Sequence, residues 1–200
     1  MSQICHLDFQ TGIDLIHEKL YGELSFVKGQ IQLWQGPNGV GKTSLLNYLR
    51  ENDKNFFPNY RTVFATQKPL RVLGDFTSND LISHLQKFLP QSEQLEIGTF
   101  FKMMDFTPLL SRPIRFLSGG ENQILKLASC LMIKGDIYFL DEATSHLDEE
   151  KTQKLFTYLG KKKKNSSIVM IEHHPHAQKI SDHKIFFKKN QGRLELIHGT

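Results

Sequence analysis

Residues 33–52 read LWQGPNGVGKTSLLNYLREN and place three glycines within six positions, between an apolar run and a helix-like pattern. Glycine packs no side chain, so this density indicates a backbone that bends unusually or approaches a ligand closely. Residues 36–43, GPNGVGKT, fit the pattern GxxxxGK[ST], which requires a strand before it and a helix after it. The flanking sequence predicts both, a strand at 30–35 and a helix at 42–51.

This pattern forms a cradle for phosphate groups. Its backbone N–H groups turn inward around anionic oxygens, and the start of the following helix adds a partial positive charge. Lys42 supplies a full charge to the outer phosphates, while the Thr43 hydroxyl can hold Mg²⁺. The residues that we expect to bind a nucleotide here are Gly36, Pro37, Asn38, Gly39, Val40, Gly41, Lys42, Thr43 and Ser44.

Composition describes an ordinary soluble chain. Its 200 residues are 39% apolar and 23% charged, which suffices for one substantial core. No run approaches the roughly 18 to 20 apolar residues of a membrane span, and the first residues lack the apolar centre of a secretory signal. The two cysteines, Cys5 and Cys130, are too few for a disulfide scaffold and fit a reducing compartment. We therefore expect a cytoplasmic protein.

Strand patterns alternate with helix patterns along the chain, which predicts an α/β layered fold with a mostly parallel core sheet. From about residue 70 to 130 helix patterns occur without a convincing strand, so we expect an inserted helical subdomain there. The expected strands are 30–35, 61–66, 136–140 and 167–172, and the expected helices are 42–51, 78–89, 95–105, 120–133 and 148–160.

Two carboxylates end one of the apolar strands, in DIYFLDE at 136–142. Sheets of this kind place ligands at the carboxyl ends of their strands, so we expect Asp141 to hold Mg²⁺ there. Glu142 points in a different direction and is placed to polarise a water for attack on the γ-phosphate. An acidic loop after a core strand would be the plain explanation of this pair, but the phosphate cradle favours the catalytic one.

A second glycine turn opens another helix in FLSGGENQILKLASCLM, residues 116–132. The turn Ser118-Gly119-Gly120 thus makes a second anion-binding helix start. The chain therefore has two phosphate-binding turns but only one complete cradle. We predict that the second turn closes over the nucleotide held by a second copy of the protein.

With these motifs the sequence resembles the ATP-binding cassette (ABC) ATPase family, whose signature motif is LSGGQ or LSGGE. The remaining family motifs follow in order within about residues 24–188: Gln67 resembles the Q-loop, SHLD at 145–148 the D-loop, and His173 the switch histidine. The resemblance implies a P-loop NTPase fold of the ABC type, as a single domain over residues 1–200. Such a fold has a mostly parallel core sheet, a small antiparallel β subdomain and an inserted helical subdomain.

The resemblance also implies ATP and Mg²⁺ as ligands and a role for each motif residue. It places Glu142, His173 and Gln67 in catalysis and assigns the metal to Thr43, Gln67 and Asp141. Ser118, Gly119, Gly120 and Asp148 would reach across a head-to-tail dimer, formed with a second copy or a homologous cassette. Family dimers close on ATP and reopen after hydrolysis, and this stroke usually drives a separate transmembrane permease.

The expected function is therefore the ATP-hydrolysing subunit of an ABC transporter, peripheral on the cytoplasmic face of the membrane. A soluble ABC-type ATPase in translation or DNA maintenance is the alternative, although the translation factors carry two cassettes in one chain and the DNA-repair types insert a long coiled coil. A nucleotide sensor without turnover is a third possibility, against which Glu142 argues. The sequence determines neither the transported substrate nor its direction.

Three further features lead to narrower expectations. The family's adenine-stacking aromatic falls by spacing near Ile13, with Phe9 and Tyr21 as the nearest aromatic candidates, while Trp34 is expected in the core. The lysine run GKKKKN at 160–165 is best interpreted as a solvated helix end, where lysines complement the helix dipole. Anionic lipid is the next interpretation of this run, and nucleic acid is an unlikely partner.

Overall fold

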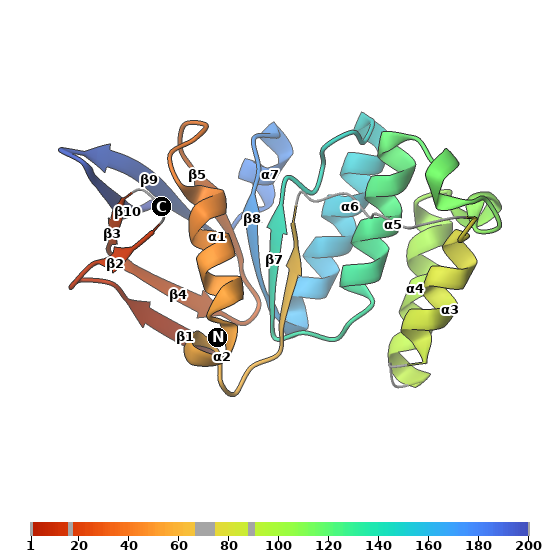
Figure 1. Ribbon diagram of the computed structural model, residues 1–200, viewed down its shortest axis with the longest axis horizontal. Helices are drawn as coiled ribbons and strands as arrows, with labels where there is room; N and C mark the ends of the chain where they lie inside the picture. The colour runs from red at the N-terminus through yellow and green to blue at the C-terminus, as the bar shows by residue number, and fades with distance from the viewer. Residues whose placement is uncertain (1, 16–17, 67–74, 88–90, 200) are drawn as a thin grey trace.

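A computed structural model describes residues 2–15, 18–66, 75–87 and 91–199 of the chain. Within these residues an eight-stranded sheet forms the centre of the molecule, with the order β2-β3-β10-β9-β5-β8-β7-β6 (Figure 1). A separate two-stranded sheet pairs β1 with β4. The strands are β1 Gln3–Asp8, β2 Ile13–Asp14, β3 Lys19–Tyr21, β4 Glu23–Val27, β5 Ile31–Gln35, β6 Thr62–Ala65, β7 Ile137–Asp141, β8 Ser167–Ile171, β9 His183–Asn190 and β10 Arg193–Gly199.

The four strands expected from the sequence form the parallel part of the sheet. β5 pairs with β8, β8 with β7, and β7 with β6, all in parallel. Every residue of β7 and of β8 is buried, as expected for parallel strands covered on both faces. Their carboxyl ends therefore meet at one edge of the sheet, where the predicted nucleotide site lies.

The strands that lie beyond β5 in this sheet add antiparallel pairs to the parallel core. β9 and β10 form a hairpin, and β9 continues the sheet by pairing in parallel with β5. β2 pairs antiparallel with β3, and β1 pairs antiparallel with β4. The antiparallel β part that the sequence predicted is thus present in the described residues.

Helices cover both faces of the parallel strands (Figure 1). Side chains alternate along β7, so Ile137 and Phe139 belong to one apolar cluster while Tyr138 and Leu140 belong to another. Leu45, Leu46 and Leu49 of α1 (Lys42–Glu51) complete the first cluster. The second contains the apolar faces of α5 (Gly119–Leu131) and α6 (Glu149–Lys162).

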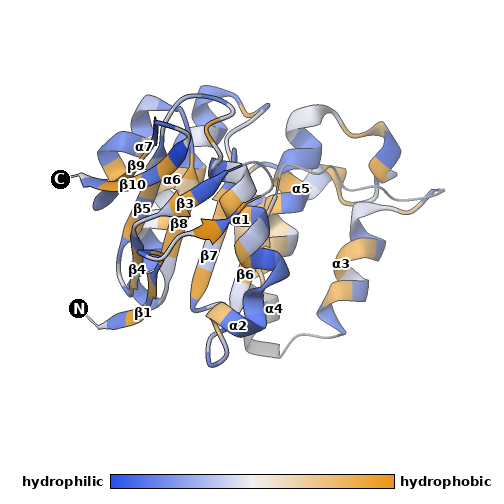
Figure 2. Cartoon of the chain, turned by 60° about the vertical axis from the view of Figure 1, so that its left-hand side comes forward, coloured by the Kyte–Doolittle hydropathy of each residue, from blue (hydrophilic) through white to orange (hydrophobic). Residues whose placement is uncertain are grey.

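The segment predicted to be helical contains α3 (Ser78–Gln86), α4 (Gln91–Met103) and two 3₁₀ turns, η1 (Thr107–Leu109) and η2 (Ile114–Phe116). These elements lie beyond α5, at one end of the molecule (Figure 1). Figure 2 shows both hydrophobic and hydrophilic colours along α3, as expected for a helix with one face on a core. The remaining short elements are α2 (Asp53–Phe56), η3 (Lys163–Asn165) and α7 (Pro175–Ile180).

Some predicted boundaries were wrong. α4 begins at Gln91 rather than at residue 95, and α6 begins at Glu149 because Asp148 is its N-cap. Pro175 opens α7 as its first helical residue, a position where proline loses no hydrogen bond. Trp34 is fully buried, as predicted, and its indole Nε1 donates to Gln32 Oε1 at 2.7 Å. No helix among the described residues is long and apolar enough to cross a membrane.

Candidate functional site

The glycine-rich loop between β5 and α1 has the backbone that a phosphate cradle needs. Gly36, Gly39 and Gly41 have φ angles of 151°, 74° and 112°, a region that residues with a side chain rarely adopt. A Cβ atom on Gly36 would also lie 2.8 Å from the carbonyl oxygen of Phe187. Glycine is thus required here both by the turn and by the close packing against β9.

Lys42 folds back over this loop. Its Nζ donates to the carbonyl oxygens of Gly36 at 2.7 Å and of Pro37 at 3.0 Å, and the residue is only 6% exposed. Burial lowers the pKa of the Lys42 ammonium, while the nearby carboxylates of Asp141 and Glu142 act in the opposite direction. The charge predicted to bind the outer phosphates therefore lies inside the loop.

The first turn of α1 leaves room for an anion. Gly41 is its N-cap, no side chain caps it, and its first turn carries no acidic residue. The N–H groups at a helix start have no partner within the helix, so an uncapped start favours a bound phosphate. This is the arrangement expected of a nucleotide site.

Thr43 and Asp141 lie together at the carboxyl edge of the sheet. The Thr43 hydroxyl donates to Asp141 Oδ2 at 3.2 Å. Asp141 is 1% exposed and its Oδ1 has no hydrogen-bond partner, and burial raises the pKa of its carboxyl group. An orphaned carboxylate oxygen beside a hydroxyl fits a hard cation such as Mg²⁺, which prefers oxygen ligands. Gln67, the third expected metal ligand, lies outside the described residues.

A cavity of about 210 Å³ joins the cradle to the candidate catalytic groups. Glu142 lines it with an unusual backbone φ of 49°, and its N–H donates to the carbonyl oxygen of Ile171 at 3.0 Å. Left-handed conformations of side-chain-bearing residues carry strain and cluster at functional sites. The lining residues are Asn38, Gly39, Gly41, Lys42, Thr43, Ser44, Glu142, Ile171 and His173.

The second glycine turn does not line this cavity. Ser118 and Gly119 are exposed at the start of α5. Ser118 Oγ accepts from the Glu121 N–H at 3.3 Å, and Glu121 Oε2 accepts from the Ser118 N–H at 2.6 Å. This reciprocal capping box satisfies two of the donors at the helix start. The turn is therefore stable within its own chain and faces outward.

The second turn also packs against the loop that follows Glu142. A Cβ atom on Gly120 would lie 2.5 Å from the carbonyl oxygen of His146, so only glycine fits. One turn further along α5, Gln123 Nε2 donates to the carbonyl oxygens of Ala143 at 2.8 Å and Glu142 at 3.2 Å. The start of α5 is thereby joined directly to the loop that contains Glu142 and Ala143.

Glu172, which sequence reasoning missed, holds the same loop from the other side. Its Oε1 accepts from the Thr144 N–H at 2.7 Å and its Oε2 from the Thr144 hydroxyl at 2.9 Å. It is 5% exposed, and burial raises the pKa of its carboxyl group despite these hydrogen bonds. The signal was available, because Glu172 is a polar residue at the end of an apolar strand, as Asp141 is.

The two remaining site residues lie near the surface. Asp148 is exposed, and its Oδ1 accepts from the Lys151 N–H at 2.8 Å, which caps α6. His173 is exposed and lines the same cavity as Lys42 and Glu142. The next residue, His174, lies 3.1 Å from Glu149 Oε2 through its Nε2, which joins this segment to the start of α6.

The aromatic candidates for stacking on adenine differ in exposure. Phe9 is 2% exposed and packs edge-on against Phe56, so its candidacy was wrong. Tyr21 is half-buried, and the guanidinium of Arg193 lies 5.2 Å from its ring centroid. Ile13 also packs against the apolar cluster that contains α1.

Comparisons with known proteins place this chain near ATP-binding proteins of transporters. A family model described as "ABC transporter" matches residues 22–145, more than half of the chain. The zinc import ATP-binding protein ZnuC of Anaplasma phagocytophilum is 32% identical over 158 residues, which cover 74% of this chain and 64% of that relative. The phosphate import ATP-binding protein PstB of Mycoplasmoides gallisepticum is 37% identical over 193 residues, covering 90% of this chain and 58% of that protein.

A solved structure titled "Structure of ATP binding subunit of ABC transporter" superposes with a TM-score of 0.79 at 16% identity. The superposition covers 100% of this chain and 90% of that one, so it shows the fold, which is the α/β P-loop fold expected from the sequence. The chain spans less than two thirds of the length of the ZnuC and PstB relatives.

Proposed function

The chain belongs to the ABC transporter family, and from this premise we propose that it binds and hydrolyses ATP as the nucleotide-binding subunit of a transporter. One observation carries the proposal. A single cavity brings together the glycine-rich loop, the Lys42 ammonium, Thr43 beside the orphaned Asp141 oxygen, and Glu142. We propose further that residues 1–200 act as one ABC ATPase domain.

In the proposed reaction the loop amides and Lys42 bind the phosphates of ATP, and Thr43 and Asp141, with Gln67, hold Mg²⁺. When bound there, Mg²⁺ would supply positive charge to offset that of the phosphates. Glu142 accepts a proton from a water whose oxygen forms a bond to the γ-phosphorus. The bond from this phosphorus to the bridging oxygen breaks, leaving ADP and inorganic phosphate. His173 contacts the γ-phosphate.

We propose that two chains share each nucleotide. The outward-facing Ser118-Gly119-Gly120 turn and the exposed Asp148 would meet the nucleotide cavity of a second copy, or of a homologous cassette, in a head-to-tail dimer. Ser118 Oγ already accepts one hydrogen bond from its own helix, so its hydroxyl proton is the group left to donate to a partner's nucleotide. Bound ATP would thus stabilise the dimer.

A separate membrane permease is the partner that we propose for this dimer, on the cytoplasmic face of the membrane. ZnuC and PstB are import ATP-binding proteins by name, which supports a transport role. Phe76 and Phe116 are 39% and 57% exposed, and the Ile114 N–H donates to the Phe76 carbonyl oxygen at 2.9 Å, which brings their segments together. Exposed aromatic residues near one another support a protein contact there.

The hydrolytic step is tested with Glu142→Gln, which keeps the shape of the side chain and removes the base. Phosphate release should fall by a factor of roughly 10² to 10⁴, the usual contribution of general-base catalysis, while ATP binding persists. Glu51→Gln, at the exposed end of α1, is the control and should retain full turnover. Turnover of Glu142→Gln near that of the control would show that another group activates the water.

A further inference from the structure

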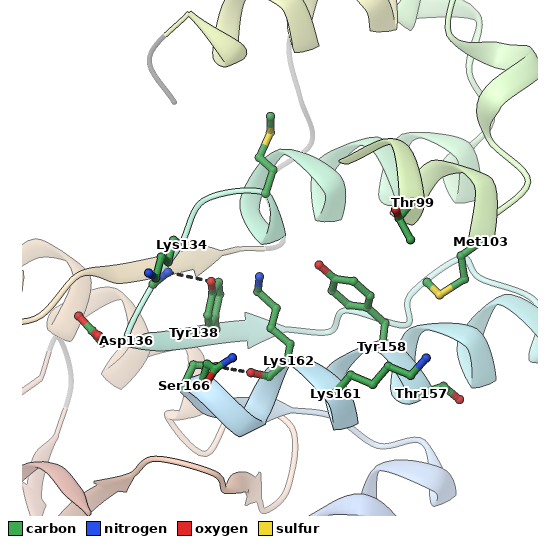
Figure 3. Close-up of a pocket in the computed structure, with 13 residues that line it drawn as sticks. Thr99, Met103, Lys134, Asp136, Tyr138, Thr157, Tyr158, Lys161, Lys162 and Ser166 are labelled. Carbon is green, nitrogen blue, oxygen red and sulfur yellow. Dashed lines mark hydrogen bonds between the residues drawn. The ribbon is translucent and has the colours of Figure 1, made fainter. Parts of the chain in front are cut away.

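A second and larger cavity lies away from the nucleotide site (Figure 3). Its volume is about 690 Å³, and it lies between α4, the end of α5 and the end of α6. Residues 134–136 and 165–166 line it just before β7 and β8 begin, whereas the nucleotide cavity lies where these strands end. A volume of roughly 300 to 1,000 Å³ is typical of small-molecule sites.

The walls of this cavity combine positive charge with apolar surface. Lys134, Lys161 and Lys162 contribute ammonium groups. The acidic residue among the described lining residues, Asp136, already accepts a hydrogen bond from the Arg61 N–H at 2.9 Å. Apolar surface comes from the rings of Tyr138 and Tyr158 and from the side chains of Met103 and Met132.

Lys162 is held over aromatic rings at the centre of this wall. Its Nζ lies 4.9 Å from the ring centroid of Tyr138 and 5.8 Å from that of Tyr158, distances at which a cation is attracted to a ring. Figure 3 shows the Lys162 and Tyr158 side chains extending into the space between the helices. The positive charge of Lys162 therefore lies next to the apolar surface of the two tyrosine rings.

Hydrogen bonds fix the backbone around these side chains. The Tyr138 hydroxyl accepts from the Gly135 N–H at 2.8 Å and donates to the Ile133 carbonyl oxygen at 2.7 Å. The Ser166 hydroxyl donates to the Lys162 carbonyl oxygen at 3.0 Å. A wall that is already ordered loses little entropy when a ligand binds.

We propose that this cavity is a binding site for a small organic anion with an apolar body, whose charge contacts the lysines and whose body contacts the tyrosine rings and methionines. The site is separate from the nucleotide cavity, at the opposite end of β7. The lysine run therefore divides into Lys161 and Lys162, which line the cavity, and Lys163 and Lys164, which do not.

Calorimetric titration of the whole chain, saturated with Mg-ADP to fill the cradle, tests the proposal with 1-naphthyl phosphate as the probe. We expect one probe to bind per chain, about tenfold or more tightly than 1-naphthol or inorganic phosphate, because these carry only the body or only the charge. Displacement of the probe by further Mg-ADP, or equal binding of inorganic phosphate, would overturn the proposal.

Matched variants locate the probe. Lys162→Gln and Lys161→Gln should each weaken it about tenfold, the usual effect of losing a hydrogen bond to a charged group. Lys164→Gln removes the same charge from another exposed position, three residues beyond Lys161, and should leave the affinity unchanged. If circular dichroism shows that Lys162→Gln does not fold, the probe affinity of Lys161→Gln tests the proposal instead, because Lys161 is exposed and its substitution should not disturb folding. An equal loss in Lys164→Gln would mean that the run is only a diffuse basic surface, and the proposal would be wrong.

Discussion

Two glycine-rich turns open helices in this chain, and they use glycine for different physical reasons. Before α1, Gly36, Gly39 and Gly41 are needed because the backbone enters the left-handed region. At the start of α5, Gly120 does not have a positive φ, and glycine is needed because a side chain would strike the His146 carbonyl oxygen. One turn is shaped for a ligand and the other for close contact with a neighbouring loop.

The two helices also differ in how their first turns are capped. α1 has neither a side-chain cap nor an acidic residue in its first turn, whereas α5 has a complete capping box from Ser118 and Glu121. An uncapped start favours an external anion, and a capped start is already stable alone. The first turn should therefore bind nucleotide unaided, and the second should contribute only when two chains meet.

The largest effect should come from the cradle. Lys42→Ala removes the buried ammonium and leaves only backbone donors for the outer phosphates, so ATP affinity should fall about 100-fold, given the strength of charged hydrogen bonds. Ser118→Ala should change the affinity of the isolated chain less than twofold. Calorimetry at low salt measures both. Equal losses in the two variants would abolish the distinction between the turns.

A smaller effect should follow from filling the contact at the second turn. Gly120→Ala places a Cβ atom 2.5 Å from a backbone oxygen, so the free energy of unfolding should fall by about 1–3 kcal/mol, as for other overpacked sites. Gly160→Ala, inside α6 with open space around it, is the control and should stabilise by about 0.5–1 kcal/mol. Denaturant unfolding measures both. If the two variants had the same free energy of unfolding, close packing against His146 would not explain the glycine at position 120.

The smallest effect should come from the α5 cap. Ser118→Ala removes the acceptor for the Glu121 N–H and should lower the free energy of unfolding by about 1 kcal/mol, the usual cost of losing a helix cap. Ser118→Asn retains an N-cap acceptor, so its free energy of unfolding should stay close to that of the unchanged chain. Urea titration followed by circular dichroism is sensitive enough. A loss that Ser118→Asn does not restore would point to a role for the hydroxyl other than capping.

Sequence patterns predicted those parts of the molecule that depend on local order. The buried strands, the cradle and the start of α5 are each encoded within about twenty residues, through apolar runs, glycine spacing and capping residues. The pairing of β9 beside β5 was not predictable in this way, because it joins residues 31–35 to residues 183–190. Only the chain's tertiary packing brings them together.

The same limit applies to the site. The position of Asp141 and Glu142 beside the cradle could be predicted because they end an apolar strand, while their roles stay predictions. The hydrogen bonds from Thr144 to Glu172 and from Gln123 to Ala143 join residues 28 and 20 positions apart, and neither pair has a local motif. The contact of Gly120 with His146 likewise became visible only in three dimensions.

The central claim is that the second glycine turn completes the nucleotide site of another copy, and sedimentation of Glu142→Gln tests it most directly. Without nucleotide this variant should sediment as a monomer, and with Mg-ATP as a dimer, because ATP that bridges the interface stabilises only the dimer. Adding Ser118→Arg should abolish the dimer while the monomer still binds ATP. A dimer that forms equally with and without ATP, or that tolerates Ser118→Arg, would contradict the account and leave this turn as a structural helix cap.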